Sequence, residues 1–179
     1  MTATATAAPT TAAPEALPGP AAQLFGPSHR ALRHALCGLL SRLGSELLTD
    51  PEAARAVVAE LEQVLQLCEA HRELEDRFVY PPLAARQRGS LDPFVQAHAE
   101  QPRRVAELQA LGRTLLETSP ARRAAAGHTL ALHFSTFTAE LLVHMAEEEQ
   151  LLLPLLVRTF EARELEAMNH RLLASALAP

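Results

Sequence analysis

The chain of 179 residues has the length of one domain, or of one domain with a tail. With 48% hydrophobic and 21% charged residues it can bury a core, but only 4% of residues are aromatic and none is Trp. Leu, Ala and Val must therefore build that core, which favours helix over strand, and the net charge of −5 without any Lys argues against nucleic acid as a partner.

The sequence also lacks the signals of a membrane or secreted protein. No apolar stretch reaches the roughly 18 uncharged residues of a membrane span, and the N-terminus has neither the basic region nor the apolar run of a secretory signal. Two cysteines, Cys37 and Cys68, are too few for a disulfide framework and suit a reducing compartment. We therefore expect a cytoplasmic protein with no membrane partner, and the sequence points to no particular protein partner.

Residues 1–24 consist mainly of Ala, Thr and Pro, and their prolines prevent a regular helix. Few large apolar side chains are available there to pack on a core. We expect a disordered tail over 1–24 and a folded domain over 25–179.

Turn signals divide the folded part into four long helical segments and a short one, with Ser28 as a possible N-cap of the first. The predicted segments run over 27–48, from 49–51 to the proline pair at 81–82, over 92–117, from 119–120 to about 154 or beyond, and over 161–177. Apolar residues recur in them at steps of three and four. Because the connections are short, we predict an all-α fold: an antiparallel up-down-up-down four-helix bundle with a short C-terminal helix.

Polar residues interrupt two of the apolar stripes in the same way. His71 and Glu75 lie four residues apart on an inward face, and so do His144 and Glu148. The segments HRELEDRFVYPPL, starting at residue 71, and HMAEEEQLLLPLL, starting at residue 144, both follow the pattern His-x3-Glu-x5-Pro-x-Leu. The chain therefore resembles two copies of one helical hairpin.

Each motif is preceded by a helix with one His near its start, His29 in the first hairpin and His98 in the second. From His29 the chain runs about 19 residues to its helix end and then about 20 residues back to His71, or ~30 Å in each direction. The second hairpin matches less closely, with about 19 and 24 residues. Four imidazoles and two carboxylates should therefore meet near one end of the bundle.

Such a cluster is costly without a cation, because buried unpaired carboxylates each cost several kcal/mol or become protonated. Two metal ions would supply the charge, with both carboxylates as bridges. His and carboxylate ligands select first-row transition metals, so we expect two iron ions about 3.5–4 Å apart; manganese is an alternative, and zinc is less favoured because it prefers single tetrahedral sites. The predicted ligands are His29, His71, Glu75, His98, His144 and Glu148.

A plainer interpretation exists for each residue alone. A single His on an apolar face is more often a core residue than a ligand, and the acidic triplet 147–149 alone resembles a solvated run of charge. The repeated spacing and the matched register favour metal binding for the six residues together. Glu149 is the alternative to Glu148 as a ligand.

Other polar residues near the motifs are expected to do less. Tyr80 and Arg72 could lie behind the ligands, but packing at the helix end is the interpretation we favour. His133 lies three turns before His144 and is expected in the core or behind the site. The remaining histidines are expected at the surface: His34, His128 and His170.

The motifs resemble those of the hemerythrin-like, or HHE cation-binding, family. The likeness rests on His29 in PSHRALRHAL, on HRELE at 71–75, on His98 in VQAHAEQ and on the segment 144–156, and it covers residues 27 to about 175. It implies an antiparallel four-helix bundle that holds a non-haem, carboxylate-bridged di-iron centre, which meets dioxygen or related small molecules.

One position departs from the pattern of the oxygen-carrying hemerythrins, which have a second His four residues after the first on the third helix. Here that position is Pro102. Six protein ligands would then replace seven, and one iron should have a more open coordination, which favours reaction over reversible storage.

Three functions follow from this pattern. The one we favour is a di-iron protein that binds or senses dioxygen, peroxide or nitric oxide. A di-iron enzyme, for peroxide decomposition or oxygen-dependent oxidation, would need a substrate pocket that the sequence does not reveal. An iron-responsive interaction module, whose fold is stabilised by metal loading, is the third.

Overall fold

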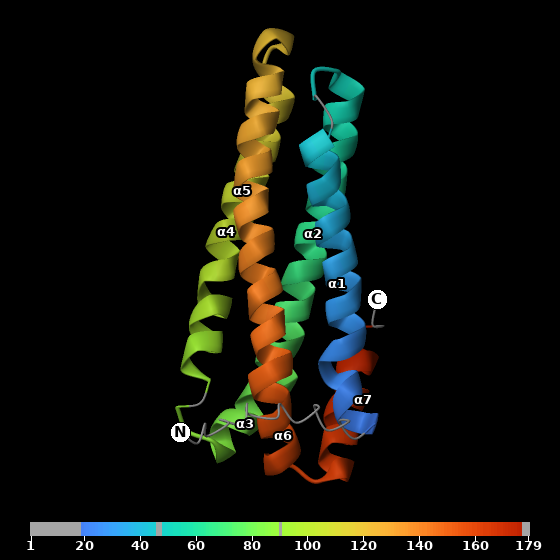
Figure 1. The fold of residues 1–179 in the computed structure, drawn as a ribbon, viewed down its shortest axis with the longest axis vertical. Coiled ribbons are helices and arrows are strands. Elements are labelled where there is room, and N and C mark those ends of the chain that lie inside the picture. The colour runs from blue at the N-terminus through green and yellow to red at the C-terminus, as the bar shows by residue number, and fades with distance from the viewer. Residues whose placement is uncertain (1–18, 46–47, 90, 177–179) are drawn as a thin grey trace, which may run out of the picture.

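The computed structural model describes residues 19–45, 48–89 and 91–176, and this part of the chain is helical without strands. The four long helices are α1 (Gly19–Ser45), α2 (Pro51–Phe78), α4 (Asp92–Glu117) and α5 (Pro120–Glu147). They run alternately up and down side by side (Figure 1). The predicted all-α, up-down-up-down four-helix bundle is therefore confirmed.

Four short elements lie at the lower end of the bundle in Figure 1: α3 (Tyr80–Arg86), η1 (Glu148–Leu152), α6 (Leu153–Thr159) and α7 (Ala162–Ala176). The last of these is the predicted C-terminal helix, and it packs against α1 and α2. Its inward residues, Leu165 and Met168, are buried. The predicted tail over 1–24 falls mostly on residues 1–18, which lie outside the described residues.

Helix α1 begins at Gly19, earlier than the predicted start at 27–28. Pro27 lies inside the helix, and Ser28 is no N-cap, because its hydroxyl donates to the Phe25 carbonyl one turn back (2.9 Å). Proline removes only one helical hydrogen bond, and the extra turn buries Leu24 and Phe25. The burial of these two side chains outweighs the lost bond.

The start of α2 follows the sequence prediction. The Asp50 carboxylate accepts a hydrogen bond from the Ala53 N–H (2.8 Å), and Pro51 occupies the first helical turn. The helix ends at Phe78, and a single residue, Val79, joins it to α3, whose first turn holds the predicted proline pair. This break places Tyr80 at the start of a new helix and turns it into the bundle.

The second motif does not break its helix but widens it. The chain passes from α5 into the π-helical turn η1, where the Leu153 N–H donates to the Glu148 carbonyl five residues back. Pro154 follows and has no N–H to offer the Gln150 carbonyl. Single π turns are frequent at functional sites, and this one begins at the second predicted bridging carboxylate.

Two apolar clusters fill the bundle on either side of a polar layer. The larger runs along the four long helices and includes Leu36, Leu61, Leu108 and Phe134. The smaller lies at the end with the short helices and includes Phe25, Tyr80, Leu83 and Leu156. The predicted site residues separate the two clusters, as His29 does between Phe25 and Leu32 and as Glu148 does between Met145 and Leu152.

No helix of the described part is long and apolar enough to span a membrane. Both cysteines are free thiols, Cys37 exposed and Cys68 buried in the larger cluster.

The two thiols should react very differently with a thiol reagent. Burial, aided by the nearby Glu69 carboxylate, raises the pKa of Cys68 to about 12, so almost no reactive thiolate exists at pH 8. We predict that one thiol per chain reacts rapidly in the folded protein and that the second reacts only after denaturation, as measured with a chromogenic disulfide. Cys37→Ser should remove the rapid phase, and a rapid phase of two thiols would contradict this packing.

Candidate metal centre

The six predicted ligands meet in the polar layer as two overlapping groups. One group contains His29 and His71 and the other contains His98 and His144, and Glu75 and Glu148 belong to both. In each group the ligand atoms all lie within 4.8 Å of one another. The matched register of the two hairpins, inferred from helix rise, is what brings these four helices to one level.

The first group is centred on the two carboxylates that face His29. The Nε2 atom of His29 lies 3.6 Å from Glu75 Oε1 and 3.4 Å from Glu148 Oε2. His71 directs its own Nε2 to Glu75 Oε1 at 3.1 Å. Both carboxylates are almost fully buried, and His29 is fully buried.

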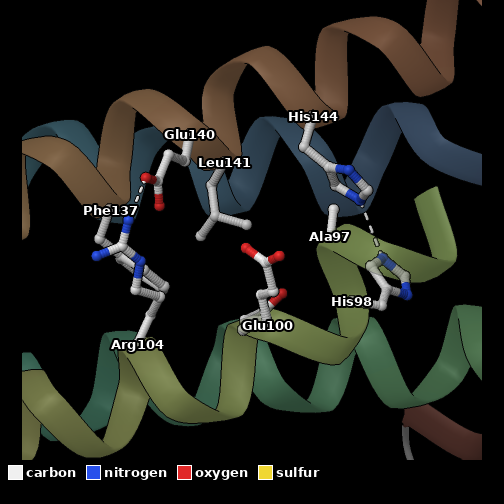
Figure 2. A pocket seen from close by; sticks show the side chains of 9 residues that line it. Ala97, His98, Glu100, Arg104, Phe137, Glu140, Leu141 and His144 are labelled. Atoms are coloured by element: carbon white, nitrogen blue, oxygen red, sulfur yellow. Dashed lines mark hydrogen bonds and ion pairs between the residues drawn. The ribbon is translucent and has the colours of Figure 1, made fainter. Parts of the chain in front are cut away.

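The second group is built from α4 and α5. His98 Nε2 lies 3.6 Å from Glu75 Oε2 and 2.9 Å from His144 Nε2, and His144 Nε2 lies 3.5 Å from Glu148 Oε1. Figure 2 shows His98 and His144 facing each other across the two helices. The two oxygens of each carboxylate therefore face different groups, which is the geometry of a bridging ligand.

Several polar atoms of this layer are not satisfied by hydrogen bonds within the protein. Among the described residues, several of these buried atoms lie close to one another but form no well-aligned hydrogen bond: His29 Nε2, His71 Nε2, both Glu75 oxygens and Glu148 Oε2. An unpaired buried polar atom is expensive, and a buried charge more so. These atoms are also the donor types that first-row transition metals prefer. The residues present therefore fit a pair of metal ions.

The titration behaviour of the layer reflects the same excess of negative charge. Burial alone lowers the pKa of His29, but the Glu148 and Glu75 carboxylates outweigh it and raise that pKa to about 9. Burial would raise the pKa of Glu75, but His71 and His29 lower it to about 2. The two carboxylates thus favour a proton on His29, and a metal ion would have to displace it before the imidazole could bind.

Two further carboxylates accept hydrogen bonds from the Nδ1 atoms of two of the imidazoles. Asp76 Oδ1 accepts from His98 Nδ1 (2.8 Å), and Glu149 Oε1 accepts from His29 Nδ1 (2.8 Å). Each carboxylate is in turn anchored by an arginine: Asp76 by Arg72 (2.9 Å) and Glu149 by Arg33 (2.8 Å). Such partners fix the ring and leave its Nε2 free for a metal.

These pairings cross between the hairpins. Asp76 belongs to the first motif and holds His98 of the second hairpin, whereas Glu149 belongs to the second motif and holds His29 of the first. Glu149 is partly exposed and occupied in this way, while Glu148 is fully buried and faces both groups. Of the two alternatives from the sequence, the geometry therefore favours Glu148 as the ligand.

Tyr80 also contacts the layer, which the packing interpretation of the sequence missed. Its hydroxyl donates to Glu148 Oε1 (2.7 Å) and lies 3.1 Å from His98 Nε2, and its ring stacks on His98 with the centroids 4.7 Å apart. The corresponding position in the second motif is Leu153. The half of the layer around His98 and His144 therefore contains a phenol that the other half lacks.

The remaining histidines lie away from this layer. His133 is exposed, contrary to the expectation of a core position, because Leu130, Phe134 and Phe137 take the inward positions of that stretch of α5. The three histidines expected at the surface are exposed: His34, His128 and His170.

Fold and layer together define a four-helix bundle built to hold metal ions. The family model described as the hemerythrin HHE cation binding domain matches residues 23–156, and the chain belongs to this family of metal-binding proteins. The matched region contains all six predicted ligands and ends before α7. A search of the curated proteins finds no match.

The repeated sequence pattern contained a signal for the supporting carboxylates. Both motifs continue with a second acidic residue directly after the predicted bridging one, Asp76 after Glu75 and Glu149 after Glu148. Only the packing of α1 on η1 and of α2 on α4 shows which imidazole each of them reaches. The position of Tyr80 depends on the helix break at Val79, slightly before the proline pair at which the sequence predicted the end of this helix.

Removing the charge of a supporting carboxylate should weaken metal binding. We predict that Asp76→Asn lowers metal affinity about 10–100-fold, because the amide cannot orient His98 as the carboxylate does. The measurement is competition with a chromogenic chelator. Glu147→Gln is the control, since Glu147 is an exposed carboxylate one residue from Glu148. Equal affinities for the two variants would show that Asp76 does not act on the centre.

Proposed function

We propose that the chain is a non-haem di-iron protein that binds or senses dioxygen, peroxide or nitric oxide. The proposed ligands are His29, His71, Glu75, His98, His144 and Glu148. The observation that supports this most is that two groups of ligand atoms share both carboxylates, as a bridged pair of ions requires. The donor set favours iron, with manganese as an alternative and zinc less suited.

When bound, an iron pair supplies reversible redox chemistry between the ferrous and ferric states. The chain itself contributes a largely buried, fixed environment, because Glu75, Glu148 and His29 are at most 2% exposed and apolar clusters lie on both sides of the layer. Fixed dipoles and charges act more strongly where water is excluded.

Tyr80 holds a proton beside one half of the layer. Burial, together with the negative charge of Glu148, raises the pKa of this phenol far above its usual range, so the hydroxyl stays protonated at neutral pH. It donates that proton to Glu148 Oε1 in the structure. For a small molecule that gains negative charge near His98 and His144, this hydroxyl would be an adjacent proton donor.

The same half has room for such a molecule. Pro102 stands where the oxygen carriers have a third imidazole, and it is exposed. The neighbouring Gln101 points inward instead, but its amide donates to the Cys68 carbonyl on α2 (3.1 Å). The turn of α4 after His98 therefore supplies no ligand, which supports an open position at the His98–His144 half.

The predicted location and partners belong to this proposal as well. We infer a reducing compartment such as the cytoplasm, supported by the two free thiols, and a small diatomic molecule or peroxide as the partner rather than nucleic acid or membrane.

We predict that His144→Ala sharply lowers the iron bound by the purified protein, whereas His170→Ala, a change of an exposed His on α7, leaves it unchanged. Elemental analysis of both variants measures this directly. Equal iron in the two would refute the ligand assignment.

Three measurements on the wild-type protein then distinguish the three candidate functions. Reversible absorbance changes on adding and removing dioxygen support binding or sensing. Gas evolution from peroxide would instead support an enzyme, and metal-dependent folding without any redox response would support an interaction module.

A further inference from the structure

The two halves of the polar layer differ in how they open to the outside. Beside His98 and His144 lies a cavity of about 260 Å³ between α4 and α5 (Figure 2). Beside His71 the space is only about 90 Å³, and Leu172 of α7 helps to close it. Of these two cavities, only the one between α4 and α5 is large enough to bring a molecule larger than a few waters to the layer.

The inner part of the larger cavity is apolar and ends on the imidazoles. Phe137 and Leu141 of α5 and Ala97 of α4 line it, next to His98 and His144. Figure 2 shows Ala97 and Leu141 on opposite helices with the two imidazoles at one end of the space. An organic group placed here would lie against the proposed ligands.

The outer part of the cavity carries an excess of negative charge. Arg104 is paired with Glu140 across the two helices (2.5 Å), so these charges cancel. Glu100, on the same stretch of α4, accepts a hydrogen bond from the neutral Gln96 amide (3.4 Å). Within the described part of the chain no cation is in ion-pair contact with Glu100, and Figure 2 shows its carboxylate directed between the helices. A cationic group is therefore favoured at the entrance and an anionic one is disfavoured.

The size of the cavity exceeds what dioxygen or peroxide requires. A protein cavity of about 150 Å³ holds benzene, whereas drug-sized ligands occupy about 300–1,000 Å³. A volume of about 260 Å³ thus suits an organic molecule with one ring or a short alkyl chain.

We propose that the α4–α5 cavity binds a small organic amine, with its apolar body on Phe137 and Leu141 and its ammonium group beside Glu100. The apolar end then faces His98 and His144. This inference rests on the proposed function and deepens it. It names the class of organic molecule that binds beside the proposed metal pair. Binding to the cavity itself is measurable without any metal.

The test uses benzylamine as the probe, with benzyl alcohol and benzoate as neutral and anionic analogues of the same shape. Ligand-observed NMR on the metal-free full chain should give saturable binding of benzylamine with a Kd of roughly 1 mM, as expected for so few atoms. Benzyl alcohol should bind more weakly, and benzoate should not saturate.

Two variants locate the probe. Ala97→Phe, at an exposed helical position, should fill the cavity without disturbing the core and abolish binding. Glu100→Gln should weaken benzylamine about 3-fold, the scale of an exposed ion pair, without weakening benzyl alcohol. Glu166→Gln, the same charge change on α7, is the control and should have no effect. Helical circular dichroism checks that each variant is folded.

The second experiment uses the iron-loaded protein, whose iron content is measured first. Benzylamine should change its visible absorption spectrum. Tighter binding of benzoate, no binding of benzylamine, or binding that survives Ala97→Phe would overturn the inference, as would an unchanged spectrum of the loaded protein. If the chain binds no iron, the proposed function fails, while the NMR arm still decides whether the cavity takes an amine.

Discussion

The structure depends on the charge balance around two buried carboxylates. Glu75 and Glu148 lie between the two apolar clusters of the bundle, and their side chains are 2% and 0% exposed. An uncompensated charge in such a position costs several kcal/mol. Without metal, the imidazoles carry part of the compensation, as the raised pKa of His29 indicates. Buried oxygens without hydrogen-bond partners remain. Two cations would neutralise both buried carboxylates at once. The free energy of metal binding would then also stabilise the folded protein.

The supporting residues tie the two hairpins into one unit. Since Asp76 of one motif holds His98 of the other hairpin, and Glu149 holds His29, neither hairpin can complete its own half of the layer. Both halves also share both carboxylates. The duplicated sequence therefore produces a single centre rather than two independent sites. The duplication is incomplete at Tyr80, whose counterpart is Leu153, so the two halves differ chemically.

The fold and the convergence of the six predicted ligands could be predicted from the sequence because both follow from spacing. Helix rise relates His29 to His71, and the repeated His-x3-Glu pattern identifies the inward carboxylates. The sequence prediction misplaced the start of α1, because the burial of Phe25 outweighs the helix-breaking tendency of Pro27. It also missed the hydroxyl of Tyr80, which enters the layer only because α2 breaks at Val79. Contacts that depend on a break or on packing between distant helices leave no periodic pattern.

The most direct test of a shared, bridged pair of ions is anomalous X-ray diffraction from crystals of the iron-loaded protein. The proposed di-iron centre predicts two iron peaks per chain inside the polar layer, one against His29 and His71 and the other against His98 and His144, with Glu75 and Glu148 touching both. A single peak, or peaks only at the protein surface, would contradict it.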